Sequence, residues 1–305
     1  MARRLLAGVE AGGTKFVCAV GTGPDDLRAE ARIPTTTPGE TLQAVAGFLQ
    51  DATRRHGPVA AMGVACFGPV DPDPASPGYG RIAATPKAGW SGADVLGFLR
   101  GRLGGVPAAF DTDVNGAALG ERTWGAAQGL HTFAYVTVGT GVGGGGMAGG
   151  RLLHGLVHPE MGHLPVRRDP VRDPFPGCCP FHGDCLEGLA SGPAIEARWG
   201  RPARDLAGRP EVWDLEAGYL GDAIATIALV LSPQRVVLGG GVMDQPGLIE
   251  AVRARAAARL AGYVRHPRLD GDLSDFVVRP ALGARAGVLG ALALAAGAAG
   301  TPIPS

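Results

Sequence analysis

The sequence of 305 residues lacks an excess of either charge, since 28 basic residues balance 28 acidic ones. Proteins that bind nucleic acid normally carry a basic excess, so we expect no nucleic-acid partner. Lysine is nearly absent, with only Lys15 and Lys87 among the 28 basic residues. A chain that otherwise uses arginine is expected to keep lysine where a compact point charge matters, although two lysines could also remain by chance.

Long apolar runs are also missing. Only five apolar residues stand between the two N-terminal arginines and Glu10, which is too short for the apolar region of a secretory signal. Residues 286–305 are uncharged but rich in glycine and alanine, which predicts a packed helix and a tail rather than a membrane span. We therefore expect a cytoplasmic protein with no membrane partner. In that reducing compartment five cysteines disfavour a disulfide framework, so the grouping of three between Cys178 and Cys185 needs another explanation.

The composition is typical of a folded α/β protein with two lobes. Apolar residues make up 46% of the chain, enough to fill hydrophobic cores. The length fits two domains of about 100–200 residues each. Residues 5–9 and 16–20 are predicted strands that flank a turn, in the strand–turn–strand order of a meander. We place the first lobe at residues 1–120 and the second at residues 121–283, with a final helix over residues 284–299 that packs back onto the first.

Three glycine-rich turns, each directly after a predicted strand, give the first functional signal. They lie at residues 12–15, 139–146 and 239–241, and a returning strand is predicted over residues 147–153. Glycine lets backbone N–H groups approach a phosphate closely and point at it. The second turn matches the dinucleotide fingerprint G-x-G-x-x-G, but the glycines that follow disfavour the helix that this motif requires. One such turn is as often an ordinary tight turn, whereas three together with Lys15 favour a nucleotide.

Two acids, Asp111 and Asp113, follow a short predicted strand at the junction of the two predicted lobes. Acids in such positions are common helix caps, which is the alternative interpretation. A carboxylate there can instead accept the proton of a substrate hydroxyl that attacks a γ-phosphate. Phosphoryl transfer depends mainly on positioning and charge stabilisation, so a base of ordinary acidity suffices.

Cysteine and histidine alternate in a spacing that suits a metal. Cys179, His182 and Cys185 are spaced C-x₂-H-x₂-C, and His163 is available as a fourth ligand. Thiolates and imidazoles are the ligands that tetrahedral Zn²⁺ takes. The alternative is a set of partly buried free thiols with surface histidines. Cys178 is adjacent to Cys179 and is expected to be a bystander, because neighbouring side chains in extended backbone point to opposite sides.

At this point eight ordered motifs resemble the ROK family of sugar kinases, and within it the bacterial fructokinase branch. They are EAGGTK at residues 10–15, CFGPVD at 66–71, TPKAGW at 85–90, DTDVNG at 111–116, GTGVGG at 139–144, EMGH at 160–163, CPFHGDC at 179–185 and GGGVM at 239–243. The resemblance covers most of the chain. It departs from the commoner family pattern at Glu10, Thr112 and His182, and these three variants resemble the fructokinase branch.

The resemblance implies an actin-like, ribonuclease-H-like pair of lobes that close over a sugar. It implies Asp113 as the catalytic base and Glu160, His163 and Thr112 as sugar-binding residues. By the same resemblance, the residues that bind the nucleotide are Gly12, Gly13, Thr14, Lys15, Thr140, Gly141, Gly239, Gly240 and Gly241. A structural zinc site is implied at His163, Cys179, His182 and Cys185. Members of the family are often homodimers.

We therefore expect ATP- and Mg²⁺-dependent phosphorylation of D-fructose to D-fructose 6-phosphate. The nearest alternative is the same chemistry on glucose, mannose or an N-acylmannosamine. A sugar-responsive repressor, which the family also contains, would need a DNA-binding domain ahead of Glu10, where nine residues stand. A third alternative is a zinc-stapled binding module without catalysis, which would have no use for Asp113.

Overall fold

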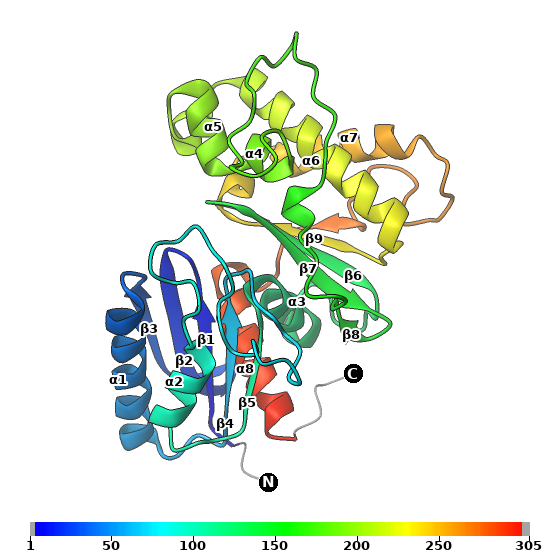
Figure 1. Ribbon diagram of the computed structural model, residues 1–305. Coiled ribbons are helices and arrows are strands. Elements are labelled where there is room, and N and C mark those ends of the chain that lie inside the picture. The colour runs from blue at the N-terminus through cyan, green and yellow to red at the C-terminus, as the bar shows by residue number, and fades with distance from the viewer. Residues whose placement is uncertain (1–3, 301–305) are drawn as a thin grey trace. The chain divides into compact units, whose positions relative to one another are not determined.

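The computed structural model describes residues 4–300 of the chain. Within them the chain forms two compact units, each built around its own sheet (Figure 1). Unit 1 holds the described residues up to Gly129, the segment Leu152–Pro159 and the described residues from Ala281 onward, while unit 2 holds Leu130–Arg151 and Glu160–Pro280. The lobe boundary expected at residue 120 falls inside helix α3 (Asp113–Trp124).

Unit 1 contains a five-stranded mixed sheet in the order β3-β2-β1-β4-β5. Its strands are β1 (Leu6–Ala11), β2 (Lys15–Gly23), β3 (Asp26–Pro34), β4 (Ala61–Cys66) and β5 (Ala108–Thr112). The first three form an antiparallel meander, as the strand–turn–strand order predicts, and β4 and β5 run parallel to β1. Side chains alternate across the sheet, so Ala7 and Val9 face one core while Leu6 faces another. Helices α1 (Pro38–His56) and α2 (Val95–Arg102) cover the first face, and α3 and α8 (Ala286–Ala298) cover the second.

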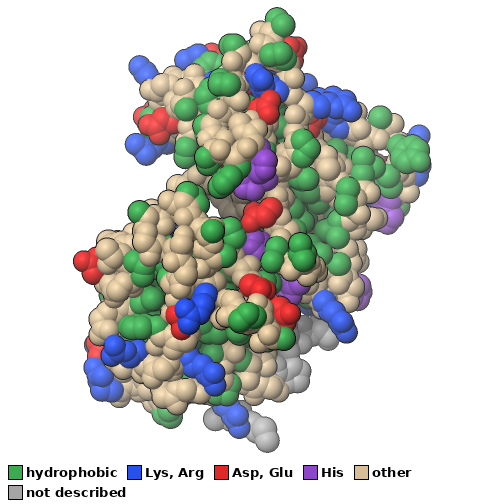
Figure 2. All heavy atoms as spheres, viewed as in Figure 1, with side chains coloured by type: hydrophobic (Ala, Val, Ile, Leu, Met, Phe, Trp, Pro, Cys, Tyr) green, Lys and Arg blue, Asp and Glu red, His purple; other side chains and the backbone are tan. Residues whose placement is uncertain are grey.

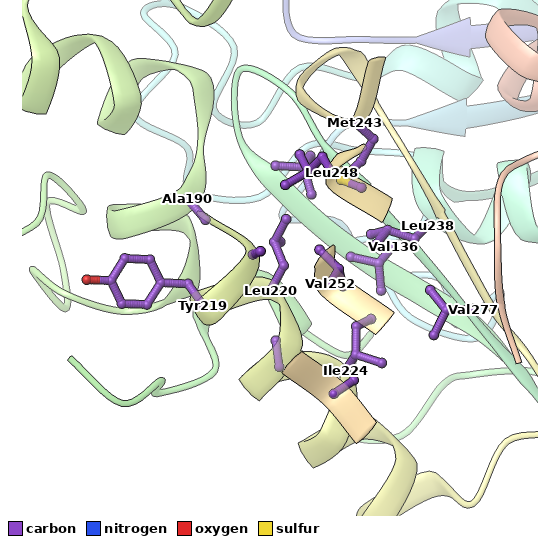
Figure 3. Packing of buried hydrophobic residues seen from close by; sticks show 14 of the residues in the cluster. Val136, Ala190, Tyr219, Leu220, Ile224, Leu238, Met243, Leu248, Val252 and Val277 are labelled. Atoms are coloured by element: carbon purple, nitrogen blue, oxygen red, sulfur yellow. The ribbon is translucent and has the colours of Figure 1, made fainter. Parts of the chain in front are cut away.

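Unit 2 contains a second five-stranded sheet, in the order β10-β9-β6-β7-β8. Its strands are β6 (Phe133–Val138), β7 (Val142–Ala148), β8 (Arg151–Leu152), β9 (Val236–Gly239) and β10 (Val277–Val278), and its helices are α4 (Leu186–Ala190), α5 (Gly192–Trp199), α6 (Pro210–Leu231) and α7 (Leu248–Leu260). Figure 3 shows Leu220 and Ile224 of α6 and Val252 of α7 gathered with side chains from β6, β9 and β10. This core holds the two long helices against the sheet.

The prediction of a glycine turn over residues 139–146 was wrong in extent. Only residues 139–141 turn, because β7 begins at Val142 and pairs with β6 along its whole length. The glycines of β7 are required by close packing. A Cβ at Gly144 would lie 2.6 Å from the Met161 side chain, and one at Gly146 would lie 2.1 Å from the Phe133 carbonyl oxygen.

Surface charge and helix hydropathy give two further observations. On the face seen in Figure 2, acidic and basic side chains are interspersed, and neither sign forms a large patch. No helix within residues 4–300 is long and apolar enough to cross a membrane.

Glycine lets helix α8 touch its neighbours through backbone atoms. A Cβ at Gly290 would lie 1.7 Å from the carbonyl oxygen of Gly116 in α3, and one at Gly120 would lie 2.6 Å from the carbonyl oxygen of Ala286. On the sheet side, a Cβ at Gly63 of β4 would lie 2.0 Å from the carbonyl oxygen of Ala291. Real Cβ atoms do not approach other atoms so closely, so only glycine fits at these three contacts. They form the groove in which α8 lies.

A buried carboxylate fixes the approach to α8. Glu121, fully buried in α3, accepts hydrogen bonds from the backbone N–H groups of Ala126, Ala281 and Leu282 at 2.6, 3.1 and 2.9 Å. Residues 281 and 282 are where the chain re-enters unit 1. A buried charge needs such hydrogen bonds, so Glu121 ties the end of α3 to the segment that leads into α8.

The groove predicts opposite effects for two Gly→Ala substitutions in α8. Gly290→Ala should lower the free energy of unfolding by about 1–3 kcal/mol, because the added methyl overlaps α3. Gly297→Ala is the matched control, since nothing lies within 4 Å of its Cβ position. It should raise the free energy of unfolding by up to ~1 kcal/mol through helix propensity. Urea unfolding of both variants measures the difference, and equal effects would show that α8 does not pack this closely.

Candidate active site

The predicted site residues fall into two groups by unit. Unit 1 holds Gly12, Gly13, Thr14, Lys15, Thr112 and Asp113. Unit 2 holds Thr140, Gly141, Glu160, His163, Cys179, His182, Cys185, Gly239, Gly240 and Gly241. Each group is described within its own unit.

The first glycine turn joins β1 to β2 and is exposed from Gly13 to Lys15. The N–H of Gly12 donates to the Lys15 carbonyl oxygen at 3.1 Å, and a Cβ at Gly12 would lie 2.7 Å from that oxygen. Thr35 braces the turn from outside, since its hydroxyl donates to the Gly12 carbonyl at 2.8 Å and its N–H to the Thr14 carbonyl at 3.0 Å. The turn is therefore held in one shape while its outer surface stays open.

Asp113 is the first residue of helix α3. Its Oδ1 accepts a hydrogen bond from the N–H of Val114 at 2.9 Å. The N-terminus of a helix carries a partial positive charge, which favours the ionised carboxylate. Thr112, predicted to bind sugar, is the helix cap: its buried hydroxyl oxygen accepts from the N–H of Asn115 at 3.1 Å. The capping role that the sequence left open for an acid is thus filled by Thr112.

Glu10 lies near the same end of β1 and has an unusual environment. Burial, and after it the neighbouring Asp113 charge, raise the pKa of its carboxyl to about 7, and Lys15 opposes the rise. Its Oε2 has no hydrogen-bond partner within the part of the chain that the structure describes. A Cβ at Gly287 would lie 2.3 Å from its carboxyl carbon, so the side chain is pressed against α8. Near neutral pH this carboxyl therefore retains a proton in a large share of the molecules.

Sequence reasoning named Asp111 but missed its partner His154. The buried Asp111 is 2.7 Å from His154 Nε2 through its Oδ2, and its Oδ1 accepts from the Asn115 side-chain amide at 2.9 Å. His154 is 43 positions from Asp111 in the sequence. No local pattern indicates such a contact, so only the fold reveals it.

The second glycine turn, in unit 2, joins β6 to β7. The N–H of Gly139 donates to the Gly141 carbonyl at 2.8 Å, and Thr140 at the tip is exposed. Glu187 of α4 accepts from the N–H of Val142 at 2.9 Å, and a Cβ at Gly141 would lie 2.7 Å from the same carboxylate oxygen. Glu187, which sequence reasoning also missed, therefore fixes the turn against α4.

The third turn follows β9. Gly240 has φ of 95° and packs on β6, where a Cβ would lie 2.3 Å from the Val138 carbonyl oxygen. Glycine at position 240 is thus required by the fold. Gly241 is exposed, with nothing within 4 Å of its Cβ position, and is free to approach a ligand.

The four predicted metal ligands come together in unit 2. His163 ends a 3₁₀ turn (Met161–His163), and Cys185 precedes α4. His163 Nδ1 is 3.4 Å from Cys185 Sγ and 3.8 Å from Cys179 Sγ, and His182 Nδ1 is 3.6 Å from Cys179 Sγ. All four ligand atoms lie within 4.8 Å of one another.

These distances fit a tetrahedral metal. Zinc bonds of about 2.3 Å to sulfur and 2.0–2.1 Å to nitrogen would separate the two ligand atoms by roughly 3.6 Å in a tetrahedron. Burial raises the pKa of the Cys185 thiol to about 11, so a cation is needed to favour the thiolate at neutral pH. Cys178 is exposed and stands outside the cluster. The residues present therefore suit zinc.

Comparison with known proteins gives a consistent result. A model of the ROK family matches residues 6–298. A putative fructokinase of Bacillus subtilis (strain 168) is 46% identical over 291 residues, covering 95% of each chain. A fructokinase of Zymomonas mobilis is 43% identical over 297 residues, covering 96% of this chain and 97% of its own. Among solved structures, a ROK family glucokinase from Streptomyces griseus in complex with glucose and AMPPNP is 26% identical, with a TM-score of 0.75 over 95% of this chain and 99% of that one.

The cluster predicts which of two adjacent cysteines holds a metal. Cys179→Ser removes one of four ligands, so it should lose most of the bound zinc and lower thermal stability. Cys178→Ser is the matched control and should keep one zinc per chain. Elemental analysis of the purified variants decides. If Cys178→Ser is the metal-free variant, the ligand is Cys178 and our assignment is wrong by one residue. If the wild type contains no zinc, the assignment of a zinc site is wrong.

Proposed function

The chain belongs to the ROK family, and on this premise we propose that it is a fructokinase, which transfers the γ-phosphoryl group of MgATP to the 6-hydroxyl of D-fructose. Two relatives that carry the fructokinase name share 46% and 43% of their aligned residues with it over nearly the whole chain. The products are ADP and D-fructose 6-phosphate. Mg²⁺ enters with ATP and spreads the charge of its phosphates.

One observation in unit 1 carries this proposal. Strands β1, β4 and β5 are parallel and in register, so Ala11, Cys66 and Thr112 lie in one row at their carboxyl ends. The first glycine turn follows Ala11 and Asp113 follows Thr112. Neighbouring strands are about 4.8 Å apart, so the turn and the carboxylate stand roughly 10 Å apart on the same edge of the sheet. A phosphate-binding turn and a base at that separation suit a kinase.

The turn would hold phosphates through backbone N–H groups and Lys15. Gly13, Thr14 and Lys15 are exposed, and the lysine ammonium would add a point charge. Holding the γ-phosphate in line with an attacking hydroxyl supplies much of the rate enhancement in phosphoryl transfer.

Asp113 would act as the general base. Its carboxylate accepts the proton of the fructose 6-hydroxyl as that oxygen forms a bond to the γ-phosphorus. The bond from the γ-phosphorus to the bridging oxygen breaks at the same time, and its electron pair leaves with ADP. Asp113 is the first residue of α3, so the partial positive charge of the helix N-terminus lies beside its carboxylate.

In unit 2 we assign Thr140 and Gly141 to a second phosphate turn and Gly239–Gly241 to the adenosine. Glu160 and His163 would bind the sugar. Two features support the latter assignment: Glu160 is exposed, and the cysteine sulfurs lie at Nδ1 of His163, which leaves its Nε2 for another partner. Thr112 would contribute through its hydroxyl hydrogen, since its oxygen caps α3.

Three finer features complete the proposal. Zinc would cross-link the loop that carries His163, with all four positions filled by protein and hence a structural role. The active form would be a homodimer, as the family resemblance implies, and it would work in the cytoplasm.

The proposal predicts the order of substrates. In an assay of ADP release, D-fructose should give a higher kcat/KM than glucose, mannose or N-acetylmannosamine, and phosphorus NMR should identify the product as the 6-phosphate. The ratio kcat/KM is the quantity to compare, because it reports how well each sugar is bound at the transition state rather than how fully it occupies the site. A higher kcat/KM with an aldose would show that this aldose, rather than fructose, is the preferred substrate.

A second prediction concerns the base. Asp113→Asn keeps the size of the side chain but cannot accept the proton, so kcat should fall by ~10²–10⁴-fold with sugar binding much less affected. Asp25→Asn, on the exposed turn between β2 and β3, is the matched control and should keep the wild-type kcat. Steady-state kinetics and calorimetric titration with fructose measure the two effects. Near-normal turnover in Asp113→Asn would remove this residue from the role.

A further inference from the structure

One short segment is assigned to unit 1 although unit 2 surrounds it in sequence. This return segment, Leu152–Pro159, leaves the second sheet and is held in unit 1 by three hydrogen bonds. The Leu153 carbonyl accepts from the Asn115 side chain at 3.3 Å, His154 Nε2 meets Asp111 Oδ2 at 2.7 Å, and His158 Nε2 accepts from the N–H of Val70 at 3.2 Å. The partners lie at the carboxyl-end edge of β4 and β5, since Asp111 is the penultimate residue of β5 and Val70 and Asn115 follow the two strands, and this is the edge assigned above to the reaction.

Asp111 is the most constrained member of this contact. Its side chain is 3% exposed, and both oxygens are used. Oδ1 accepts from the N–H of Thr112 at 2.7 Å and from the Asn115 amide at 2.9 Å, while Oδ2 meets His154. Among the described residues, the His154 ring is the one basic side chain that forms an ion-pair contact with this buried carboxylate.

The contacts of Asp111 bracket Asp113. Thr112, whose N–H is held, precedes it, and Asn115, whose side chain is held, follows it by two residues. The Thr112 hydroxyl then caps the helix through the N–H of Asn115. The first turn of α3 is thus fixed on both sides of the proposed base by one carboxylate.

The electrostatics agree with this geometry. The hydrogen bond to Asp111 raises the pKa of His154 above its usual value, burial opposes the rise, and the charges of Asp111 and Asp73 add to it. The other titratable groups near this site are Tyr79, which feels the charge of Asp111, and Glu10 and Cys66, which feel the charge of Asp113. His154, when protonated, is therefore the group placed to offset the negative charge of Asp111.

We propose that His154 is a positioning residue for phosphoryl transfer: its imidazolium keeps Asp111 ionised and in place, and Asp111 in turn holds the helix turn that presents Asp113. This inference rests on the proposed function. His154 itself touches no reacting atom in it and acts through Asp111 alone.

The inference predicts a specific dependence on pH. Without the imidazolium, the buried Asp111 carboxylate is less stabilised in its charged form and takes up a proton at higher pH. A protonated Asp111 loses acceptor strength toward Thr112 and Asn115, so Asp113 loses its fixed position. The acid limb of the kcat profile should therefore move to higher pH, and Glu10, unchanged throughout, contributes equally to every variant.

Four variants test this through kcat, the two KM values and the pH profile. His154→Leu should lower kcat by about 10- to 100-fold, the usual cost of misplacing a catalytic group, and move the acid limb to higher pH. The KM for ATP should change less than about two-fold, because the phosphate turn is untouched. His154→Gln keeps a neutral donor and should recover part of kcat. His56→Leu, at the exposed end of α1, should match the wild type.

His158→Leu separates positioning from simple loosening of the return segment. It removes the contact to Val70 but not the one to Asp111, so its acid limb should stay in place. The inference is overturned if the acid limb of the kcat profile stays in place in His154→Leu, or if it moves as far in His158→Leu as in His154→Leu. The fructokinase proposal stands in either case. A folded wild type that phosphorylates no hexose overturns the proposed function, and the inference falls with it.

Discussion

The backbone contact between α8 and its neighbours is the constraint on which unit 1 depends. Because Gly116 and Gly290 let the two helices touch, α3 runs close along α8, and its first residue is Asp113. The same helix presents Gly287 to the Glu10 carboxyl, which leaves that group buried and partly protonated near neutral pH. A larger residue in this groove would move α3 together with the proposed base. Gly116 and Gly290 therefore determine where Asp113 lies, although they do not contact its carboxylate.

Charge inside this unit is stabilised chiefly by backbone amides and a few side chains. Glu121 accepts from three N–H groups at the C-terminal end of α3. Asp111 does the corresponding work at the N-terminal end, with one N–H, one amide and one imidazole. A buried carboxylate that is fully hydrogen-bonded costs little to keep and fixes its donors in place. Helix α3 is therefore anchored at both ends by carboxylates 10 positions apart in the sequence.

Sequence patterns predicted the features whose partners lie close in the chain. The spacing of Cys179, His182 and Cys185 specifies a cluster because seven residues can fold around one centre, and the structure brings them together with His163. The meander and the ROK family were also predicted correctly. The extent of the second glycine turn was not, because glycine is equally typical of a turn and of a strand packed against a side chain such as Met161. His154 and Glu187 escaped prediction since their contacts span 43 and 45 positions.

The loop that carries the metal ligands is held by two groups of side-chain contacts rather than by helices or strands. Between the 3₁₀ turn and α4 the chain has no helix or strand longer than an isolated bridge. The cysteine–histidine cluster holds its ends. Its middle is held by Asp173, which is 2% exposed, forms an ion pair with Arg198 at 3.1 Å and accepts from the Tyr219 hydroxyl at 2.5 Å. A loop without regular structure loses conformational entropy on ordering, and these polar contacts offset part of that cost, together with the packing of Leu164, Val166 and Phe175 against the core. Because His163 belongs to the cluster that anchors this loop, the same contacts also fix the side chain that we assign to sugar binding.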